Sequence, residues 1–386
     1  MAAAAACEPG VNQSRLVRRF IEICRADSAP LREGPVFRIV ASALARLGLA
    51  VREDRTAEAA GGEVGNLIAA LPGRGRLAAH APILFSAHMD RASGGTGIRP
   101  VVKHGVIRSA GDTILGADDA AGLASVIEAL HLLVESGSDR LPVEVVFTVG
   151  EEAGLVGARH LDLSALRSRC GFVVDAEEEV GTIICRSPGR VSIRVELTGR
   201  PELTRGSAGA SDLGTSAVKM AAAAVSRMNL GRIDGETTAN VSYVAGGPAS
   251  TSANRAEIRA EASGLDERKL ERQLAHMKRV LSEVAAQSGG KVEWSARRIY
   301  EGFSLDAGSE PVSRAKAAVA LAGLRPELRS AGSGTDANVF NARGVPCAVL
   351  GAGFQGIHTR AERMPVAELV RLTRVVLHLM QGAGCA

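Results

Sequence analysis

The chain has 386 residues, of which 46% are hydrophobic, so it is long enough for two or three domains with cores of their own. Its formal charge is +4, and its basic residues are spread along the chain without interleaved aromatic residues, which argues against nucleic acid as a partner. No apolar run is long enough for a membrane span, and the first ten residues lack the pattern of a signal peptide. The six cysteines form no C-x-x-C pair, so we expect reduced thiols in a cytoplasmic protein.

The first half of the chain alternates short apolar strands with helical patterns. Strands are predicted at 66–71, 83–88, 143–148 and 171–174, and a helix is predicted at 118–136. Nearly continuous apolar strands separated by helices predict a mostly parallel sheet that is covered on both faces, in an α/β domain. The apolar face of the helix is predicted to contain Leu123, Val126, Ile127, Leu130, Leu133 and Val134.

The pattern changes near Pro188, where apolar and polar residues begin to alternate over 191–197. The predicted order from there is β-α-β-β-α-β, which is typical of a small α+β domain. Its later elements are a helix at about 213–229, strands at 240–245 and 257–263, a helix at 266–287 and a strand at 292–296. The alternation of helices and apolar strands then returns, with helices near 311–323 and from Pro365 and a strand at 345–350. We therefore predict a catalytic domain formed by 1–188 and 303–386, interrupted by an inserted lid domain at 189–302.

Five histidine and carboxylate residues lie at the ends of predicted strands or at the turns that follow them. They are His88, Asp118, Glu152, Asp175 and His358. Side chains at the carboxyl ends of parallel strands converge at one edge of an open α/β sheet, where such proteins place their sites. Mixed imidazole and carboxylate ligands suit Zn²⁺, with Mn²⁺ or Co²⁺ as alternatives, better than Ca²⁺ or Mg²⁺. The pattern predicts a site for two divalent metal ions.

Each of these residues also has a plainer interpretation when it is taken alone. His88 and Asp90 in SAHMD point the same way from a strand end, so Asp90 can orient His88 as a ligand, or the pair can be a coincidence. Asp118 in LGADDAAG can bridge two metals, or it can cap the following helix. Glu151 and Glu152 can divide the roles of base and ligand, or they can belong to a solvated acidic loop.

The whole set of motifs resembles the family that contains peptidase T, glutamate carboxypeptidase and the acyl-amino-acid deacylases, with the peptidase-T-like branch as the best match. The motifs are SAHMD, LGADDAAG, GEEAGLVGA, VVDAE, TANVSYVAGG, SGTDANVFNARGVP and GIHT, in this order and with an insertion in the middle. The resemblance runs from about residue 15 to the C-terminus. The tetrahedral aminopeptidases share the metal motifs but carry a different insertion, so they fit less well.

The resemblance implies a role for each matching residue. His88 and Asp175 would bind one metal, Glu152 and His358 the other, and Asp118 would bridge the two. Asp90 would orient His88, and Glu151 would be the general base that activates a water between the metals and later protonates the leaving amine. The resemblance also implies a non-proline cis peptide bond after Asp118 and a homodimer formed through the inserted domain.

Three positions depart from the family pattern. Ala120 replaces a lysine after GADD. The segment 199–218 contains no histidine, although the family places there a lid histidine that stabilises the oxyanion; Leu203 or Gly206 occupies its place, and Arg205 is a nearby positive charge. The substrate-facing asparagine of the lid is replaced or moved to Asn254.

Three functions remain open from the sequence. The first is a two-metal aminopeptidase or tripeptidase that acts on small peptides. The second is a deacylase or amidase that acts on an N-acyl amino acid or a specialised amide. The third, motivated by the missing lid histidine, is a metal-binding protein with weakened catalysis. Because Asp90, which would orient His88, and Glu151, which would be the base, are both present, we favour the first.

Overall fold

The computed structural model describes residues 10–92, 95–200, 215–246 and 254–385, which form two compact units. Unit 1 consists of Met1–Cys185, Ser304–Ser330 and Thr335–Ala386, and unit 2 consists of Arg186–Phe303 and Ala331–Gly334. No helix in the described ranges has the length and the apolar character that a membrane span requires.

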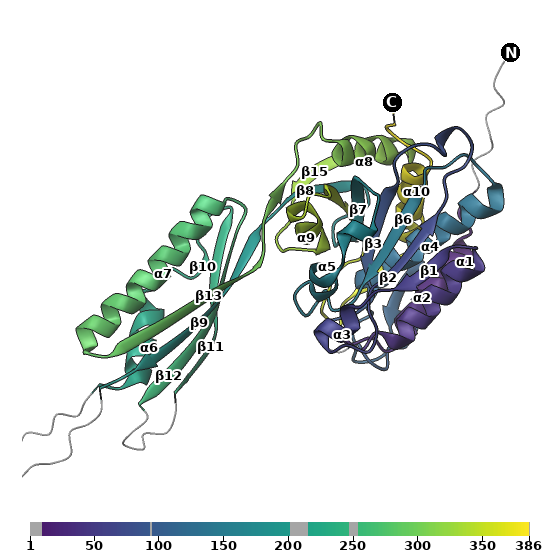
Figure 1. Cartoon of the computed structure of the whole chain (residues 1–386). Helices are drawn as coiled ribbons and strands as arrows, with labels where there is room; N and C mark the ends of the chain where they lie inside the picture. The colour runs from purple at the N-terminus through teal and green to yellow at the C-terminus, as the bar shows by residue number, and fades with distance from the viewer. Residues whose placement is uncertain (1–9, 93–94, 201–214, 247–253, 386) are drawn as a thin grey trace, which may run out of the picture. The chain divides into compact units, whose positions relative to one another are not determined.

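Unit 1 is built on a nine-stranded sheet in the order β1-β2-β6-β3-β7-β16-β8-β14, with β15 also paired to β8 (Figure 1). The central strands β6, β3, β7 and β16 run parallel, and the flanking pairs β1–β2, β2–β6 and β16–β8 are antiparallel. The strands are β1 (Ala50–Glu53), β2 (Leu67–Leu71), β3 (Ile83–His88), β6 (Val143–Thr148), β7 (Cys170–Ala176), β8 (Thr182–Ser187), β14 (Phe303–Ser304), β15 (Glu327–Ser330) and β16 (Cys347–Gly351). A separate three-stranded sheet contains β4 (Pro100–Lys103), β5 (Val106–Ser109) and β17 (Arg363–Pro365).

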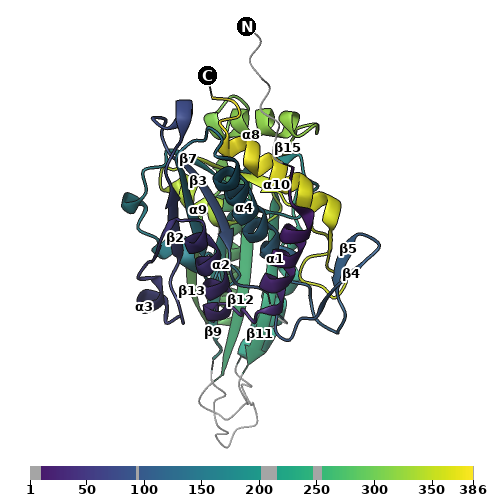
Figure 2. The ribbon, with the colours of Figure 1, turned by 90° about the vertical axis from the view of Figure 1, so that its right-hand side faces the viewer.

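Helices cover both faces of the large sheet, which confirms the predicted α/β fold class (Figures 1 and 2). On one face α4 lies against β3 and β7, and α1, α2 and α10 pack on α4, with α8 against α10. On the other face α9 lies against β7 and β16, and α5 and α3 follow it. These helices are α1 (Gln13–Arg25), α2 (Gly34–Arg46), α3 (Thr56–Ala60), α4 (Ala117–Ser136), α5 (Val156–His160), α8 (Glu310–Leu321), α9 (Asp336–Ala342) and α10 (Val366–Met380).

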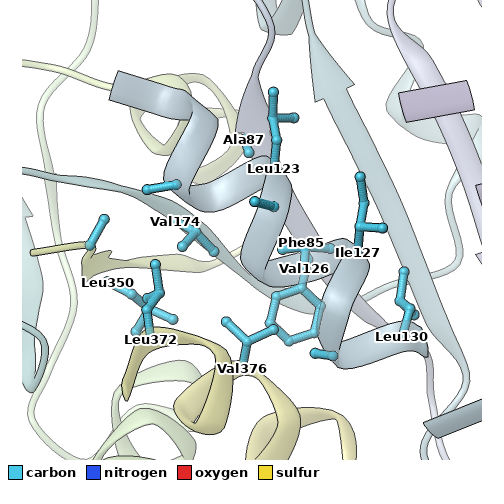
Figure 3. Packing of buried hydrophobic residues seen from close by; sticks show 14 of the residues in the cluster. Phe85, Ala87, Leu123, Val126, Ile127, Leu130, Val174, Leu350, Leu372 and Val376 are labelled. Carbon is cyan, nitrogen blue, oxygen red and sulfur yellow. The ribbon is translucent and has the colours of Figure 1, made fainter. Parts of the chain in front are cut away.

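The core of unit 1 is centred on α4, which is buried on nearly every side (Figure 3). Val126 and Ile127 lie close to Phe85 of β3, Leu123 lies beside Ala87, and Leu372 and Val376 of α10 pack on the same cluster (Figure 3). The sequence predicted a single apolar face for this helix, which is too narrow, because alanines on the other faces are buried as well. These small side chains let α1, α2 and α10 approach α4 closely, so α4, which carries Asp118 in its first turn, is held on several sides.

Unit 2 is a five-stranded antiparallel sheet in the order β10-β11-β12-β9-β13 with two helices packed on it. In β9, Val191, Ile193, Val195 and Leu197 are buried, as the alternation in the sequence predicts. Two β-bulges interrupt the ladders, one in β11 and one in β13. The elements are β9 (Gly189–Thr198), α6 (Ala217–Arg227), β10 (Gly231–Arg232), β11 (Thr237–Gly246), β12 (Arg255–Gly264), α7 (Glu267–Ser288) and β13 (Lys291–Tyr300).

Gly122 lies where α4 packs tightly against β7. A methyl group at this position would overlap the backbone oxygen of Val174 and the carboxylate of Asp119. Replacing glycine by alanine inside a helix ordinarily stabilises a protein by about 0.5–1 kcal/mol. We expect Gly122→Ala to destabilise unit 1 instead, by about 1–3 kcal/mol, because overpacking dominates.

Calorimetric melting of the metal-free protein checks this expectation. Gly235→Ala is the matched control, because a methyl group there meets no atom within 4 Å and the glycine does not have a positive φ. A Gly122→Ala variant that melts at or above the temperature of the parent protein would contradict the close-packing argument.

Candidate metal centre

The four central parallel strands of unit 1 carry the predicted ligands to one edge of the sheet. His88 is the last residue of β3, Asp175 is close to the end of β7, and Glu152 follows β6 by a short turn. His358 lies in the loop after β16, and Asp118 lies at the start of α4. Because these strands are neighbours and run the same way, the side chains that follow them converge.

Asp118 faces two groups of possible ligands with its two carboxylate oxygens. Its Oδ1 lies 3.0 Å from Nε2 of His88, and the same nitrogen lies 3.6 Å from Oδ1 of Asp175. Its Oδ2 lies 3.1 Å from Nε2 of His358, which in turn lies 2.7 Å from Oε1 of Glu152. The structure therefore brings all five sequence-predicted residues together, with Asp118 shared between the two halves.

These residues form two overlapping sets with the composition of metal sites. One set is His88, Asp118 and Asp175, and the other is Asp118, Glu152 and His358. Within each set the ligand atoms lie within 4.8 Å of one another. Each set offers one imidazole and two carboxylates, a combination that suits a borderline divalent ion such as Zn²⁺.

The site concentrates acidic side chains, and their pKa values indicate that positive charge is needed to balance them. Burial raises the pKa of Asp175 to about 8, and Asp118 adds to this rise, while His88 opposes it. Hydrogen bonds to Asp118 and Glu152 raise the pKa of His358 to about 10. The pKa of Asp118 is lowered because its hydrogen bonds to His358 and His88 outweigh its burial. Buried carboxylates this close together fit a site whose charge is balanced by divalent cations.

Asp90 connects the two halves of the site through its backbone and its side chain. Nδ1 of His88 lies 3.0 Å from the backbone oxygen of Asp90 and 3.4 Å from its Oδ1. The carboxylate also accepts the N–H groups of Glu151 at 2.9 Å and Glu152 at 3.0 Å. Asp90 thus contacts the imidazole of one ligand set and fixes the loop that carries a ligand of the other.

Two further buried side chains hold the beginning of the same loop. The N–H of Val149 donates to Oδ1 of Asn66 at 3.1 Å, and the N–H of Gly150 donates to Oε1 of Glu33 at 2.8 Å. Both acceptors are fully buried, and burial raises the pKa of Glu33 to about 7. Four consecutive N–H groups, from residue 149 to residue 152, are therefore bonded to side chains from other parts of unit 1.

Glu151 lies beside the candidate ligands but belongs to neither of the two sets that contain Asp118. The carboxylate of Glu151 lies near His88 and Glu152, and the possible ligand atoms of these three residues are within 4.8 Å of one another. Burial raises the pKa of Glu151 well above its usual range, with nearby acids adding to the effect and His88 opposing it. A carboxyl group with an elevated pKa next to a metal site can accept a proton and return it.

Glu362 was not predicted from the sequence, although it supports the shared ligand. The four consecutive N–H groups of residues 115–118 donate to its carboxylate at distances of 2.7 to 3.2 Å. The side chain is buried, and burial raises its pKa. The only signal in the sequence is an acid four residues after His358, which cannot be distinguished there from an exposed one.

Asp119 and Asp336 were also missed as supporting residues. Asp119 accepts the N–H of His88 at 3.3 Å and the N–H of Gly122 at 2.9 Å. The peptide bond between Asp118 and Asp119 is cis, as the family resemblance implies. Asp336, from the SGTDANVF motif, accepts a hydrogen bond of 2.5 Å from the hydroxyl of Thr148, while its Oδ1 is buried and has no hydrogen-bond partner among the described residues. Burial raises the pKa of Asp336 to about 6.

The structure describes only one of the two departures from the family pattern in the inserted domain. The positions of Leu203, Arg205 and Gly206 lie outside the described residues. The side chain of Asn254 accepts the N–H of Ala217 at 2.7 Å and donates to the backbone oxygen of Thr215. In unit 2 this amide is therefore engaged in joining the start of β12 to the residues that lead into α6.

The chain is similar to known proteins over most of its length. The family model described as peptidase family M20/M25/M40 matches residues 84–382. The protein YqjE of Bacillus subtilis is 37% identical over 375 residues, which cover 97% of this chain and 100% of that protein.

Solved structures agree with this match. Aminopeptidase PepT from Bacillus cereus shares 37% identity with a TM-score of 0.86, covering 96% of this chain and 98% of that one. A tripeptidase from Staphylococcus aureus shares 33% identity with a TM-score of 0.88, covering 97% of this chain and 99% of that one. The chain belongs to peptidase family M20/M25/M40, in its peptidase-T-like branch, and is a metal-dependent peptidase.

Proposed function

We propose that this protein is an aminopeptidase that hydrolyses small peptides such as tripeptides at a two-metal centre. The observation that carries the proposal is Asp118, which faces two ligand sets at once, with Glu151 beside them. The similarity to an aminopeptidase and a tripeptidase over nearly the whole chain supports the choice of substrate class.

The proposed ligands follow the two sets. His88 and Asp175 would hold one ion, Glu152 and His358 would hold the other, and Asp118 would contribute an oxygen to each. Divalent ions at such a centre lower the pKa of a water and polarise a substrate carbonyl. Zn²⁺ is the proposed ion, and Mn²⁺ and Co²⁺ suit the same ligands.

The chain supplies the proton transfers in this proposal. Glu151 takes a proton from the attacking water as the carbon–oxygen bond to the substrate carbonyl forms. It then gives that proton to the amine nitrogen as the peptide C–N bond breaks, which releases two shorter products and restores the carboxylate. Asp90 keeps His88 in one orientation and holds the backbone that carries Glu151 at a fixed place.

One feature of unit 2 supports a further part of the proposal, and one feature of the sequence favours other candidates. Tyr243 and Val244 on β11 are 43% and 46% exposed, and exposed apolar side chains on a strand favour unit 2 as the surface that pairs two copies. The absence of a histidine from 199–218 favours a second candidate, a deacylase or amidase that acts on N-acyl amino acids. A metal-binding protein with weakened catalysis is the third candidate on the same observation.

The shared ligand is tested by counting metal ions. The parent protein should hold two equivalents after dialysis, His358→Ala about one, and Asp118→Asn less than one, because Asp118 serves both ions. Elemental analysis of each variant measures the ratio. His160→Ala, an exposed histidine in α5, is the control and should keep both ions. Retention of two equivalents by Asp118→Asn would show that the bridge is misassigned.

The role of Glu151 is tested by separating metal binding from turnover. Glu151→Gln should keep both ions and lose roughly 10²–10⁴-fold in kcat for a tripeptide, because it removes the proton acceptor and leaves the ligands intact. Glu152→Gln should instead lose metal, and Glu58→Gln, on the exposed side of α3, should resemble the parent protein. Parent-like turnover by Glu151→Gln would exclude Glu151 as the base.

The substrate class is tested with matched substrates. We expect free tripeptides to be hydrolysed, and the same tripeptides with an acetylated N-terminus to lose at least about tenfold in kcat/KM, since an aminopeptidase recognises the free amine. Release of amino acids is measured by chromatography at one metal concentration. Faster turnover of N-acyl amino acids would favour the deacylase, and no turnover of any substrate by fully metal-loaded protein would favour the third candidate.

A further inference from the structure

A basic groove lies between α1 and α2 in unit 1, apart from the metal centre. The two helices are neighbours (Figure 2). A hollow of about 500 Å³ between them is lined only by residues of these helices. None of the lining residues is a candidate ligand or supports one through a hydrogen bond described above. The site is therefore independent of the proposed peptidase function.

The wall formed by α2 is a stripe of evenly spaced polar residues. Arg38, Ser42 and Arg46 recur every four residues, so they lie one above another on the same face of the helix. All three are exposed. The neighbouring stripe forms an apolar floor and contains Pro35, Ile39 and Ala43.

The wall formed by α1 adds further guanidinium groups. Arg15, Arg18 and Arg19 line the groove together with one acid, Glu22. Arg15 is already neutralised, because its Nε lies 2.7 Å from a carboxylate oxygen of Glu128 on α4. The nearest approach of Arg19 to Glu22 is 3.8 Å.

The residues that line the groove carry more positive than negative charge. Among the described residues, no carboxylate lies within ion-pair distance of Arg18, Arg38 or Arg46. With Arg15 set aside, four arginines and one glutamate leave an excess of three positive charges. Guanidinium groups gathered without acidic partners repel one another, so an anion in the groove would stabilise the arrangement.

The chemistry of the lining indicates the class of anion. A guanidinium fork matches the oxygens of a phosphate group and binds them in pairs. Residues four apart on a helix are about 6 Å apart, so Arg38 and Arg46 can contact separate phosphates with Ser42 between them. The volume is that of a small-molecule site, and no aromatic residue lines the groove for the stacking of bases. We propose that this groove binds a small molecule that carries two or more linked phosphate groups.

The proposal is tested by calorimetric titration of the metal-loaded protein at constant ionic strength. The probes are inorganic phosphate, pyrophosphate and tripolyphosphate, and metal content is measured after each titration because these anions also bind metal ions. We expect affinity to rise at least tenfold from phosphate to tripolyphosphate. Arg38→Glu/Arg46→Glu should lose at least tenfold in affinity for tripolyphosphate, and Arg38→Gln/Arg46→Gln should lose less.

The matched control is Arg268→Glu/Arg272→Glu, which makes the same charge change at two exposed arginines of α7. It should bind tripolyphosphate as the parent protein does, and melting temperatures without ligand confirm that each variant is folded. Equal binding by Arg38→Glu/Arg46→Glu and the parent protein would place the anion elsewhere and overturn the proposal. Tighter binding of a single-stranded oligonucleotide than of tripolyphosphate, at equal phosphate concentration, would replace it with a nucleic-acid surface.

Discussion

The mutual repulsion of buried carboxylates is the constraint on which the rest of unit 1 depends. The carboxylates of Asp175 and Glu152 each lie within a few ångströms of Asp118, Glu151 lies beside Glu152, and Asp90 accepts hydrogen bonds from the backbone of both glutamates. Burying such groups together is costly unless cations or hydrogen-bond donors face them. The proposed metal ions would balance the ligands, and the protein itself provides donors for the acids behind them.

Backbone N–H groups are the main donors to this second layer of acids. Glu362 accepts four of them from the turn before α4, and Asp90 accepts two from the loop after β6. Each of these bonds satisfies a carboxylate oxygen and fixes the backbone next to a ligand at the same time. Glu362 and Asp90 therefore fix two backbone segments, and these segments carry Asp118 and Glu152, which would bind metal.

The packing of α4 in the core also restricts the position of Asp118. Its buried alanines and Gly122 allow the sheet and three other helices to approach it closely, so the residue at its start has little freedom to move. A chain with 3% aromatic residues can still build such a core, because small side chains pack densely between helices. The positive groove lies on α1 and α2, so the same helical layer that braces α4 also presents the basic surface.

The sequence by itself predicted the central strands of the sheet and the candidate ligands. Strand ends, helical periodicity and the order of motifs predicted the parallel centre of the sheet, and they named His88, Asp118, Glu152, Asp175 and His358, because these residues stand at strand ends in a fixed order. The helices α1 and α2 were not predicted, and α4 was expected to have only one buried face.

Only the tertiary structure decided which acids support the site. Glu362 and Glu33 look in the sequence like ordinary surface residues, and the motif that contains Asp336 gives it no role; all three become partners of the site through backbone groups or hydroxyls that are distant in the chain. The basic groove arises in the same way, since arginines spread over two segments meet only when α1 and α2 lie side by side. Local patterns reveal what a residue can bind, whereas long-range contacts, which depend on the packed fold, decide what it does bind.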